Sequence, residues 1–286
     1  MEAQKNHSGW QRVLGIFVPY LLVVGIFQVI GALIMGVDLD NIEAVRTSFQ
    51  ILILLVLNLI GSIIVIGLFM RYVDEDKFIS LGFQFKNRLK DFFLGFGLGA
   101  FVIILGFVIL LSVGEFTVKE LVLDVNELLI SVLIFILVAI GEEMLIRGYV
   151  LRNLMMSFNK YIALIVSSVL FSLMHIFNSN IDFFALSELF IAGLLLGVSY
   201  VHTKNLWFPI GLHLSWNLFQ SLLGFNVSGK DMYSIIELEL IESNRINGGA
   251  FGFEGSILSM LFSVVCIVII HRYCKNIIKN TSVLEV

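Results

Sequence analysis

The sequence predicts an all-α membrane protein, with about eight transmembrane helices arranged around an intramembrane cavity. Its 286 residues are 58% hydrophobic and 14% charged, and 26 of them are Phe. Soluble domains run at about 45–50% apolar and about 25% charged residues. So much apolar surface exceeds what a soluble core can bury, and the bilayer itself is therefore the expected partner of this chain.

Eight apolar runs have about the length of 20 residues that a helix needs to cross a bilayer. The fifth run is the shortest, and the sixth contains Glu188, which we expect near the outer interface. No internal repeat or separate soluble domain is visible, so we expect one integral membrane domain over residues 1–286 with a core at about 128–225. The runs are Val13–Met35, Ile51–Met70, Phe92–Val113, Leu128–Ile146, Tyr161–Phe177, Phe183–Val201, Leu206–Phe225 and Ser256–His271.

Basic residues alternate between successive loops, which predicts the orientation of the spans. Lys and Arg are enriched in cytoplasmic loops. The first and third loops are acidic, and the third has only Lys119 against four carboxylates. We therefore expect a multi-pass protein of the cell membrane with both termini in the cytoplasm. The basic positions of the other loops and tails include Arg12, Arg71, Lys77, Lys86, Arg88, Lys90, Arg147, Arg152, Lys160, Lys204, Arg272 and Lys275.

Several common kinds of site are absent from the sequence. The two cysteines, Cys266 and Cys274, have no metal-binding spacing and suggest no disulfide framework. HEXXH, GxSxG and a phosphate-binding loop are also missing. We expect no nucleic-acid partner.

The segment "IGEEMLIRGYV" places Glu142, Glu143 and Arg147 at the end of a strongly apolar run. A charge in mid-membrane costs on the order of 3 kcal/mol, so such residues usually face a protein interior or a water-filled cavity. Glu143 and Arg147 are four residues apart and can pair along one helical face. The pair alone could simply mark a helix end at the interface.

Two more apolar runs contain polar residues that are typical of catalytic sites. "SSVLFSLMHIF" contains His175, and "FPIGLHLSWNLF" contains His213 and Asn217 one helical turn apart. A lone histidine in a helix is more often a packing residue. Two histidines, an asparagine and a glutamate pair on three predicted spans favour a shared site instead. His202 and His271 lie at helix ends, where we expect them to be solvated.

This set of side chains suits hydrolysis of an amide in two ways. A glutamate and a histidine can activate water as general bases, while an asparagine amide and a histidine N–H stabilise the oxyanion. Alternatively, Glu142, His175 and His213 can hold a zinc ion that keeps a position open for water.

Three motifs in order resemble the type II CAAX prenyl endopeptidase family, also called the CPBP or bacteriocin-processing family. "EEMLIRG" matches its EExxxR motif, "FSLMH" its FxxxH motif, and "HLSWN" its HxxxN motif. The resemblance is strongest over Glu142–Asn217, about a quarter of the chain, and the eight spans also look like this family. It implies an intramembrane endopeptidase acting on a hydrophobic peptide or membrane-protein substrate.

The resemblance also implies a role for each motif residue. Glu142 would be the general base assisted by His175, His213 and Asn217 would bind the oxyanion, and Glu143 and Arg147 would be the supporting ion pair. Family members are described as metalloproteases, yet a metal-free glutamate mechanism has also been argued, so both remain open. Bacterial members are associated with peptide processing and bacteriocin immunity, and the residue usage looks bacterial.

Two alternatives to an active protease follow from the same sequence. A catalytically silent immunity or regulatory protein would keep the fold, although the intact motifs argue against it. A transporter could use buried Glu and His as a proton relay. The missing internal repeat argues against that reading.

Overall fold

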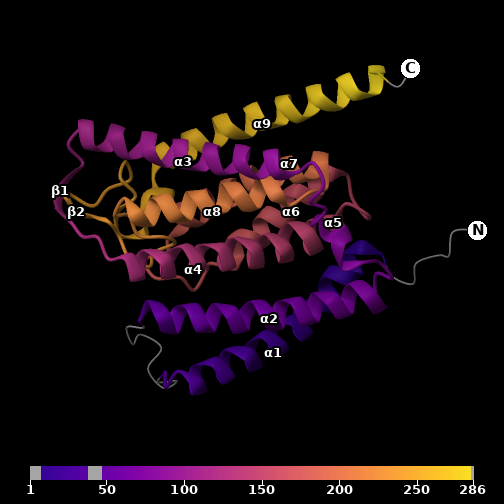
Figure 1. The fold of residues 1–286 in the computed structure, drawn as a ribbon. Helices are drawn as coiled ribbons and strands as arrows, with labels where there is room; N and C mark the ends of the chain where they lie inside the picture. The colour runs from indigo at the N-terminus through magenta and orange to yellow at the C-terminus, as the bar shows by residue number, and fades with distance from the viewer. Residues whose placement is uncertain (1–7, 38–46, 285–286) are drawn as a thin grey trace, which may run out of the picture.

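The computed structural model describes residues 8–37 and 47–284, and the side chains of the last helix up to residue 276. As predicted, it is an all-α protein with several apolar helices of membrane-spanning length (Figure 1). The helices are α1 (Gly9–Ile34), α2 (Ser48–Tyr72), α3 (Leu89–Ser112), α4 (Val125–Glu143), α5 (Arg152–Leu154), α6 (Lys160–Leu173), α7 (Phe183–Thr203), α8 (Trp207–Leu222) and α9 (Ile257–Leu284).

Six stretches of the described chain are long and apolar enough to cross a membrane, so the predicted count of eight is not confirmed. They are α1, α2, α3, the continuous helical stretch Val125–Leu154, α7 and α9 up to Asn276. The other two predicted spans correspond to α6 and α8, with 14 and 16 residues. A helix rises about 1.5 Å per residue, so these two fall short of a bilayer core of about 30 Å.

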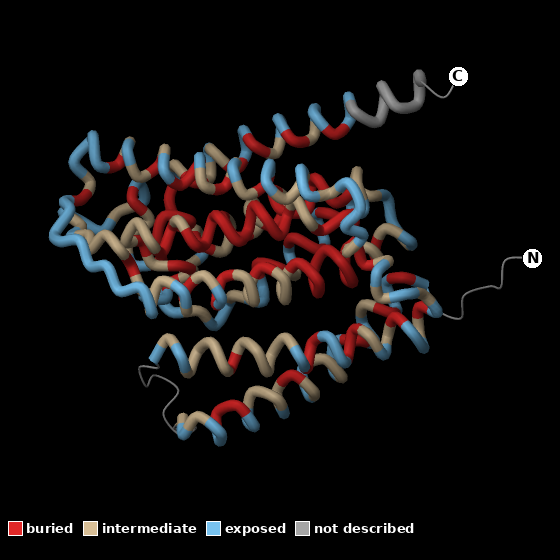
Figure 2. Tube along the Cα trace, viewed as in Figure 1, coloured by how far each residue is buried: buried red, intermediate tan, exposed pale blue. Residues whose placement is uncertain are grey.

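The short helix α8 lies in the interior of the bundle, where buried residues are concentrated (Figure 2), whereas α6 buries one face and exposes the other. Non-helical backbone at membrane depth is tolerated where it is buried in protein or lines a cavity. Residues 174–182, which follow the end of α6 at Leu173, form a largely exposed loop, and Met174, His175 and Asn178 of this loop line a cavity. This loop carries His175, which the sequence analysis had expected within a helix.

Side-chain caps fix where three of the helices begin. Thr47 and Gln50 form a reciprocal capping box at α2. Asp124 accepts from two backbone N–H groups at the start of α4. Asp182 accepts from the Ala185 N–H at the start of α7, and this hydrogen bond lowers the pKa of the Asp182 carboxyl. The negative charges of both aspartates also interact favourably with the positive, N-terminal end of the helix dipole.

Glycines allow the central helices to approach closely. A Cβ atom at Gly99 of α3 would lie 2.2 Å from Ser215 Oγ and 2.7 Å from Leu212 O of α8. A Cβ atom at Gly193 of α7 would lie 2.8 Å from Ser168 Cβ of α6, so these two helices also pack closely. In lipid, small residues at helix interfaces let the backbones approach closely, and the resulting van der Waals contact stabilises the association.

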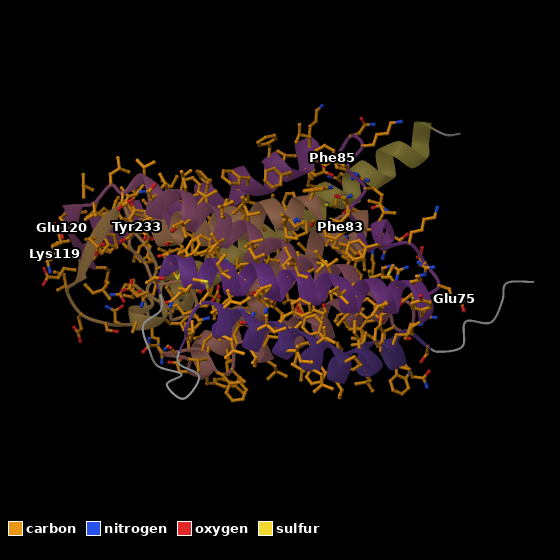
Figure 3. The ribbon with its side chains drawn as sticks, turned by 60° about the horizontal axis from the view of Figure 1, so that its bottom comes forward. Glu75, Phe83, Phe85, Lys119, Glu120 and Tyr233 are labelled. Atoms are coloured by element: carbon orange, nitrogen blue, oxygen red, sulfur yellow. The ribbon has the colours of Figure 1, made fainter. Side chains whose placement is uncertain are left out.

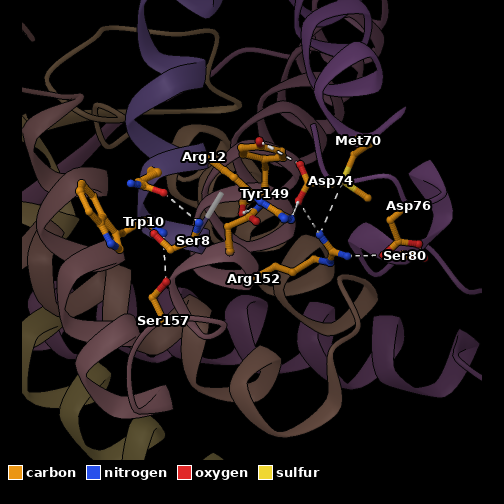
Figure 4. A network of polar contacts seen from close by, with 12 residues as sticks. Ser8, Trp10, Arg12, Met70, Asp74, Asp76, Ser80, Tyr149, Arg152 and Ser157 are labelled. Carbon is orange, nitrogen blue, oxygen red and sulfur yellow. Dashed lines mark hydrogen bonds and ion pairs between the residues drawn. The ribbon is translucent and has the colours of Figure 1, made fainter. Parts of the chain in front are cut away.

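The α1–α2 hairpin forms an outer layer that is joined to the rest by charged side chains at one end (Figures 1 and 4). Buried Asp74, just after α2, accepts from Arg12 Nη1 at 3.1 Å and from the Tyr149 hydroxyl at 3.1 Å. Arg152 adds contacts to Asp74 at 3.3 Å and to Asp76. Arg12 was expected in a solvated tail, but α1 begins four residues earlier than predicted and buries it.

A two-stranded antiparallel sheet, which the sequence analysis did not predict, closes the opposite end of the bundle. Strand β1 (Phe116–Leu121) pairs with β2 (Ile236–Leu240), which belongs to the loop between α8 and α9. Lys119, Glu120 and Tyr233 lie at this end, whereas Glu75 and Phe85 lie at the other (Figure 3). The start of α1 and the far turns of α9 also lie away from the strands (Figure 1). The cytoplasmic orientation of that end stays a prediction.

The placement of Glu188 near the outer interface stays a prediction. Its side chain lies in the second turn of α7, where α9 covers it; it is fully buried and accepts from Ser259 Oγ at 2.8 Å. His202 and His271 are not separate solvated side chains. The Nε2 atom of His202 lies 3.1 Å from the Nδ1 atom of His271, because the end of α7 packs against the middle of α9.

Candidate active site

The two neighbouring glutamates stand where the α4 helix changes its winding. α4 ends at Glu143, and a π-helical segment, Met144–Leu151, continues it without a break. Short π-helical segments inside α-helices occur frequently at functional sites. Successive helical residues point about 100° apart, so Glu142 and Glu143 face different surroundings.

Glu143 is the centre of a buried polar cluster. Its Oε1 atom accepts from Arg147 Nη1 at 2.8 Å, which is the predicted ion pair, and also from His213 Nδ1 at 2.8 Å. Arg147 donates in addition to the Gly193 carbonyl at 3.0 Å, and its guanidinium lies 4.5 Å from the centre of the Phe171 ring. The contact to His213 was not predicted, and it ties α4 to α8.

Glu142 points instead at the two histidines. Its Oε2 atom lies 4.0 Å from His175 Nε2 and 3.9 Å from His213 Nε2. That oxygen is buried and has no hydrogen-bond partner among the described residues. The structure therefore brings together Glu142, His175 and His213, which come from three separate motifs.

The hydrogen bonds of the two rings fix which nitrogen faces Glu142. His175 lies in the turn after α6, and its Nδ1 atom is 2.9 Å from the Phe171 carbonyl, which can only accept. His213 Nδ1 faces the Glu143 carboxylate in the same way. Both Nδ1 atoms must then donate, and in a neutral ring each Nε2 carries a lone pair. Two ring lone pairs and a carboxylate oxygen thus converge on one small space.

These groups line a cavity of about 330 Å³ within the bundle. Asn217, one turn after His213 on α8, lies on its wall, as predicted for a second donor beside His213. α2 contributes the apolar side chains of Ile51 and Leu55. An apolar cavity with a few converging polar groups is the usual form of a binding site for small molecules and peptides.

Residues 124–219 match the family model described as type II CAAX prenyl endopeptidase Rce1-like. The match confirms the resemblance that the three motifs indicated, and it supports protease activity. It runs from the cap of α4 almost to the end of α8 and includes every motif residue. No curated protein matches the chain. Residues 124–219 are called the Rce1-like region below.

One carboxylate of the cavity lies outside the Rce1-like region and was missed. Glu254 lines the same cavity, and its Oε1 atom accepts from the Ser228 N–H. Burial raises the pKa of the Glu254 carboxyl, while Ser228 and the charges of His175 and His213 oppose this. Glu254 lies in a loop, within "GGAFGFEG", and no local feature of that segment predicts a place in the cavity. Gly252 makes the loop possible. Its φ is 102°, and a Cβ atom at this position would lie only 1.8 Å from Asn226 O.

The donor set of Glu142, His175 and His213 suits zinc in its chemistry but not in its spacing. Zinc binds Glu oxygen and His nitrogen. The Nδ1 atoms of both rings also face a carbonyl or carboxylate oxygen, as the second ring nitrogen of zinc-bound histidines does. Tetrahedral zinc holds its ligand atoms about 3.3–3.5 Å apart, whereas these lie 3.9–4.0 Å apart. No group of three or more His, Cys, Asp or Glu in the described residues is arranged to hold a metal. Zinc at this site stays a prediction.

Proposed function

We propose that this protein is an intramembrane endopeptidase that hydrolyses a peptide bond in a hydrophobic or membrane-associated peptide or protein. The convergence of Glu142 Oε2 with the Nε2 atoms of His175 and His213 on one cavity carries this proposal. The match of residues 124–219 to an endopeptidase family supports it. We also propose that the protein lies in a bacterial cell membrane with both termini in the cytoplasm.

A water molecule in the space between these three atoms is the proposed nucleophile. It donates to Glu142 Oε2 and to His175 Nε2, since both atoms can accept. Glu142 takes a proton as the water oxygen attacks the carbonyl carbon, and His175 assists. Glu142 or His175 then returns a proton to the nitrogen as the C–N bond breaks. General bases of this kind contribute about 10²- to 10⁴-fold.

Asn217 and His213 stabilise the oxyanion in this proposal. The Asn217 amide can donate in every protonation state, whereas His213 donates through Nε2 only as the imidazolium, because its Nδ1 proton is held by Glu143. Glu143 and Arg147 act as positioning residues. They fix the ring of His213 and hold α4 against α7 through the Gly193 carbonyl.

Cleavage of hydrophobic, fluorescence-quenched peptides by purified protein in liposomes tests the proposal. Glu142→Gln should lower turnover about 10²- to 10⁴-fold, and Asn217→Ala about 10²- to 10³-fold. The control Glu120→Gln changes an exposed carboxyl of β1 and should keep full activity. Near-normal turnover by Glu142→Gln would mean that another group is the base. No cleavage by the wild type across a broad library would favour the silent immunity protein.

Metal analysis of the same preparations separates the two versions of the mechanism. If Glu142, His175 and His213 held zinc, the ion would polarise water and the substrate carbonyl. Stoichiometric zinc in the wild type that disappears in His213→Ala would contradict the metal-free version proposed here. Asn217→Ala should leave metal content unchanged in either case.

A further inference from the structure

A basic cluster lies at the end of the bundle that is remote from the strands, between three helices. Its members are Lys160 at the start of α6, His202 and Lys204 at the end of α7, and His271 and Lys275 on α9. His202 and His271 touch, and the charges of Lys160, Lys204 and Lys275 all act on His202. Five cationic or titratable side chains therefore share one small region.

The charges of the cluster are not balanced by an ion pair with any carboxylate that the structure describes. Asp91, whose charge acts on Cys274 next to Lys275, is paired with Arg88. Arg152 is close enough to influence Lys204, but its own charge is taken up by Asp74 and Asp76. Burial, followed by the charges of Lys160 and Arg152, lowers the pKa of the Lys204 amine. An anion in this position would relieve the repulsion.

Exposed apolar side chains continue from the cluster along the two flanking helices. On α9, Val264 and Val268 share a face with His271 and Lys275, at helical spacing. On α6, Ile165 and Val169 share a face with Tyr161 and are likewise exposed. The ring centres of Tyr161 and His271 are 5.9 Å apart, so the two faces meet beside the cluster.

A charged end above two apolar strips is complementary to a phospholipid rather than to a soluble anion. We infer that the basic cluster binds the phosphate of an anionic phospholipid, whose acyl chains lie along the exposed faces of α6 and α9. Basic pockets between transmembrane helices bind lipid head groups in this way. Tyr161 at the rim fits the preference of tyrosine for the membrane interface. The site is separate from the cavity around Glu142 and does not depend on the protease function.

Native mass spectrometry of the full chain, with phosphatidylglycerol or phosphatidylcholine added to delipidated protein, tests this inference. The test variant combines Lys160→Gln with Lys204→Asn, because Lys204 has a φ of 52° that asparagine adopts readily. The matched control combines Lys86→Gln with Lys90→Gln, two exposed lysines near the start of α3 that carry the same total charge.

The wild type should retain phosphatidylglycerol in preference to phosphatidylcholine. In the test variant, the preference for phosphatidylglycerol over phosphatidylcholine should fall about fivefold for each lysine removed. In the control variant it should be unchanged. Equal losses in the two double variants would overturn the inference, because general surface charge would then explain the binding. Displacement of the lipid by millimolar inorganic phosphate would overturn the assignment to a lipid. If the double variant does not fold, Lys160→Gln alone provides the same comparison, since Lys160 begins α6 and its amine lies over the exposed Tyr161 ring.

Discussion

The α1–α2 hairpin and the Rce1-like region are both apolar, yet they are held in the molecule by different means. Only 11% of the residues in the apolar stretch of α1 are buried, against 61% in α7. The Rce1-like region packs closely through Gly193, against α6, and through Gly211, against α3, and it encloses the Glu143 cluster. The hairpin has one buried anchor, in which Asp74 bonds to Arg12, Tyr149 and Arg152.

The difference shows what can stabilise a helix in lipid. Lipid tails are as apolar as leucine, so an exposed apolar helix gains little from packing on another. Association then depends on close van der Waals contact or on polar groups that lipid cannot satisfy. The Rce1-like region uses both of these, and the hairpin depends mainly on the second. Substitutions at matched positions can separate the two contributions.

The largest loss of stability is expected from Glu143→Gln. It leaves the buried charge of Arg147 without its carboxylate, and breaking a buried pair in this way costs about 3–5 kcal/mol. Glu142→Gln is the control, because Glu142 makes no ion pair with a permanent cation and should lose activity while keeping its stability. Unfolding of both variants in detergent, followed by circular dichroism, measures this. Equal destabilisation by the two changes would contradict the asymmetry of the glutamates.

A smaller loss is expected at the anchor of the hairpin, from Arg12→Met. Asp74 keeps Arg152 and the Tyr149 hydroxyl, so the cost should be about 1.5–3 kcal/mol, as for a hydrogen bond to a charged group. Backbone hydrogen exchange should accelerate in α1 and remain unchanged in α8. Arg71→Met, at an exposed position near the end of α2, should change stability by less than about 0.5 kcal/mol. Uniform acceleration in both helices would mean that the hairpin and the core unfold together.

Gly99→Ala tests close packing of α3 against α8 and should cost about 1–3 kcal/mol through overpacking. The matched control is Gly97→Ala on the same helix, where an added Cβ atom would have no neighbour within 4 Å. That control should be stabilising by about 0.5–1 kcal/mol, because alanine is the better helix former. Thermal unfolding of the two variants measures the difference. If Gly99→Ala were stabilising, the contact between α3 and α8 would be able to relax around the added methyl group.

The smallest effect is expected from Gln28→Leu within the hairpin. Gln28 Nε2 donates to the Leu54 carbonyl of α2 at 3.0 Å. Hydrogen bonds between membrane helices average about 0.6 kcal/mol, so the variant should unfold almost as the wild type does. Val29→Leu at the exposed neighbouring position provides the baseline. A loss several times larger would make this bond a second anchor of the hairpin.

Much of the fold and the motif residues could be predicted because both depend on local patterns. Apolar runs marked the starts of the eight predicted helices to within four residues, although α9 continues 13 residues beyond its predicted end at His271. The helical spacing of Glu143 with Arg147 gave their ion pair. Glu142 and the two histidines could be grouped because each interrupts an apolar run, which is costly unless a cavity or partner receives it.

The remaining features depend on contacts between distant parts of the chain. Arg12, Asp74 and Arg152 each looked like an ordinary loop charge, since nothing near Arg12 in the sequence indicates a partner 62 residues away. Glu254 enters the cavity only because the loop after α8 folds back, and Glu188 is covered only because α9 packs on α7. The strands pair across more than 100 residues, and although Ile236–Leu240 alternates apolar and acidic residues, nothing near it in the sequence indicates its partner strand.

The π-helical segment Met144–Leu151 sets the rotation of one end of a long helix relative to the other. Glu142 and Glu143 precede it and face the cavity and α8, whereas Arg152 follows it and faces Asp74. Wider winding with i→i+5 bonds shifts the angular phase of everything that follows. Removing one residue from the segment would turn Arg152 by about 100° and leave the glutamates in place. The π-helical segment thus sets the direction in which the residues after it point. With it, one continuous helix contacts two sets of partners, which regular α-helical winding would not bring into line at the same time.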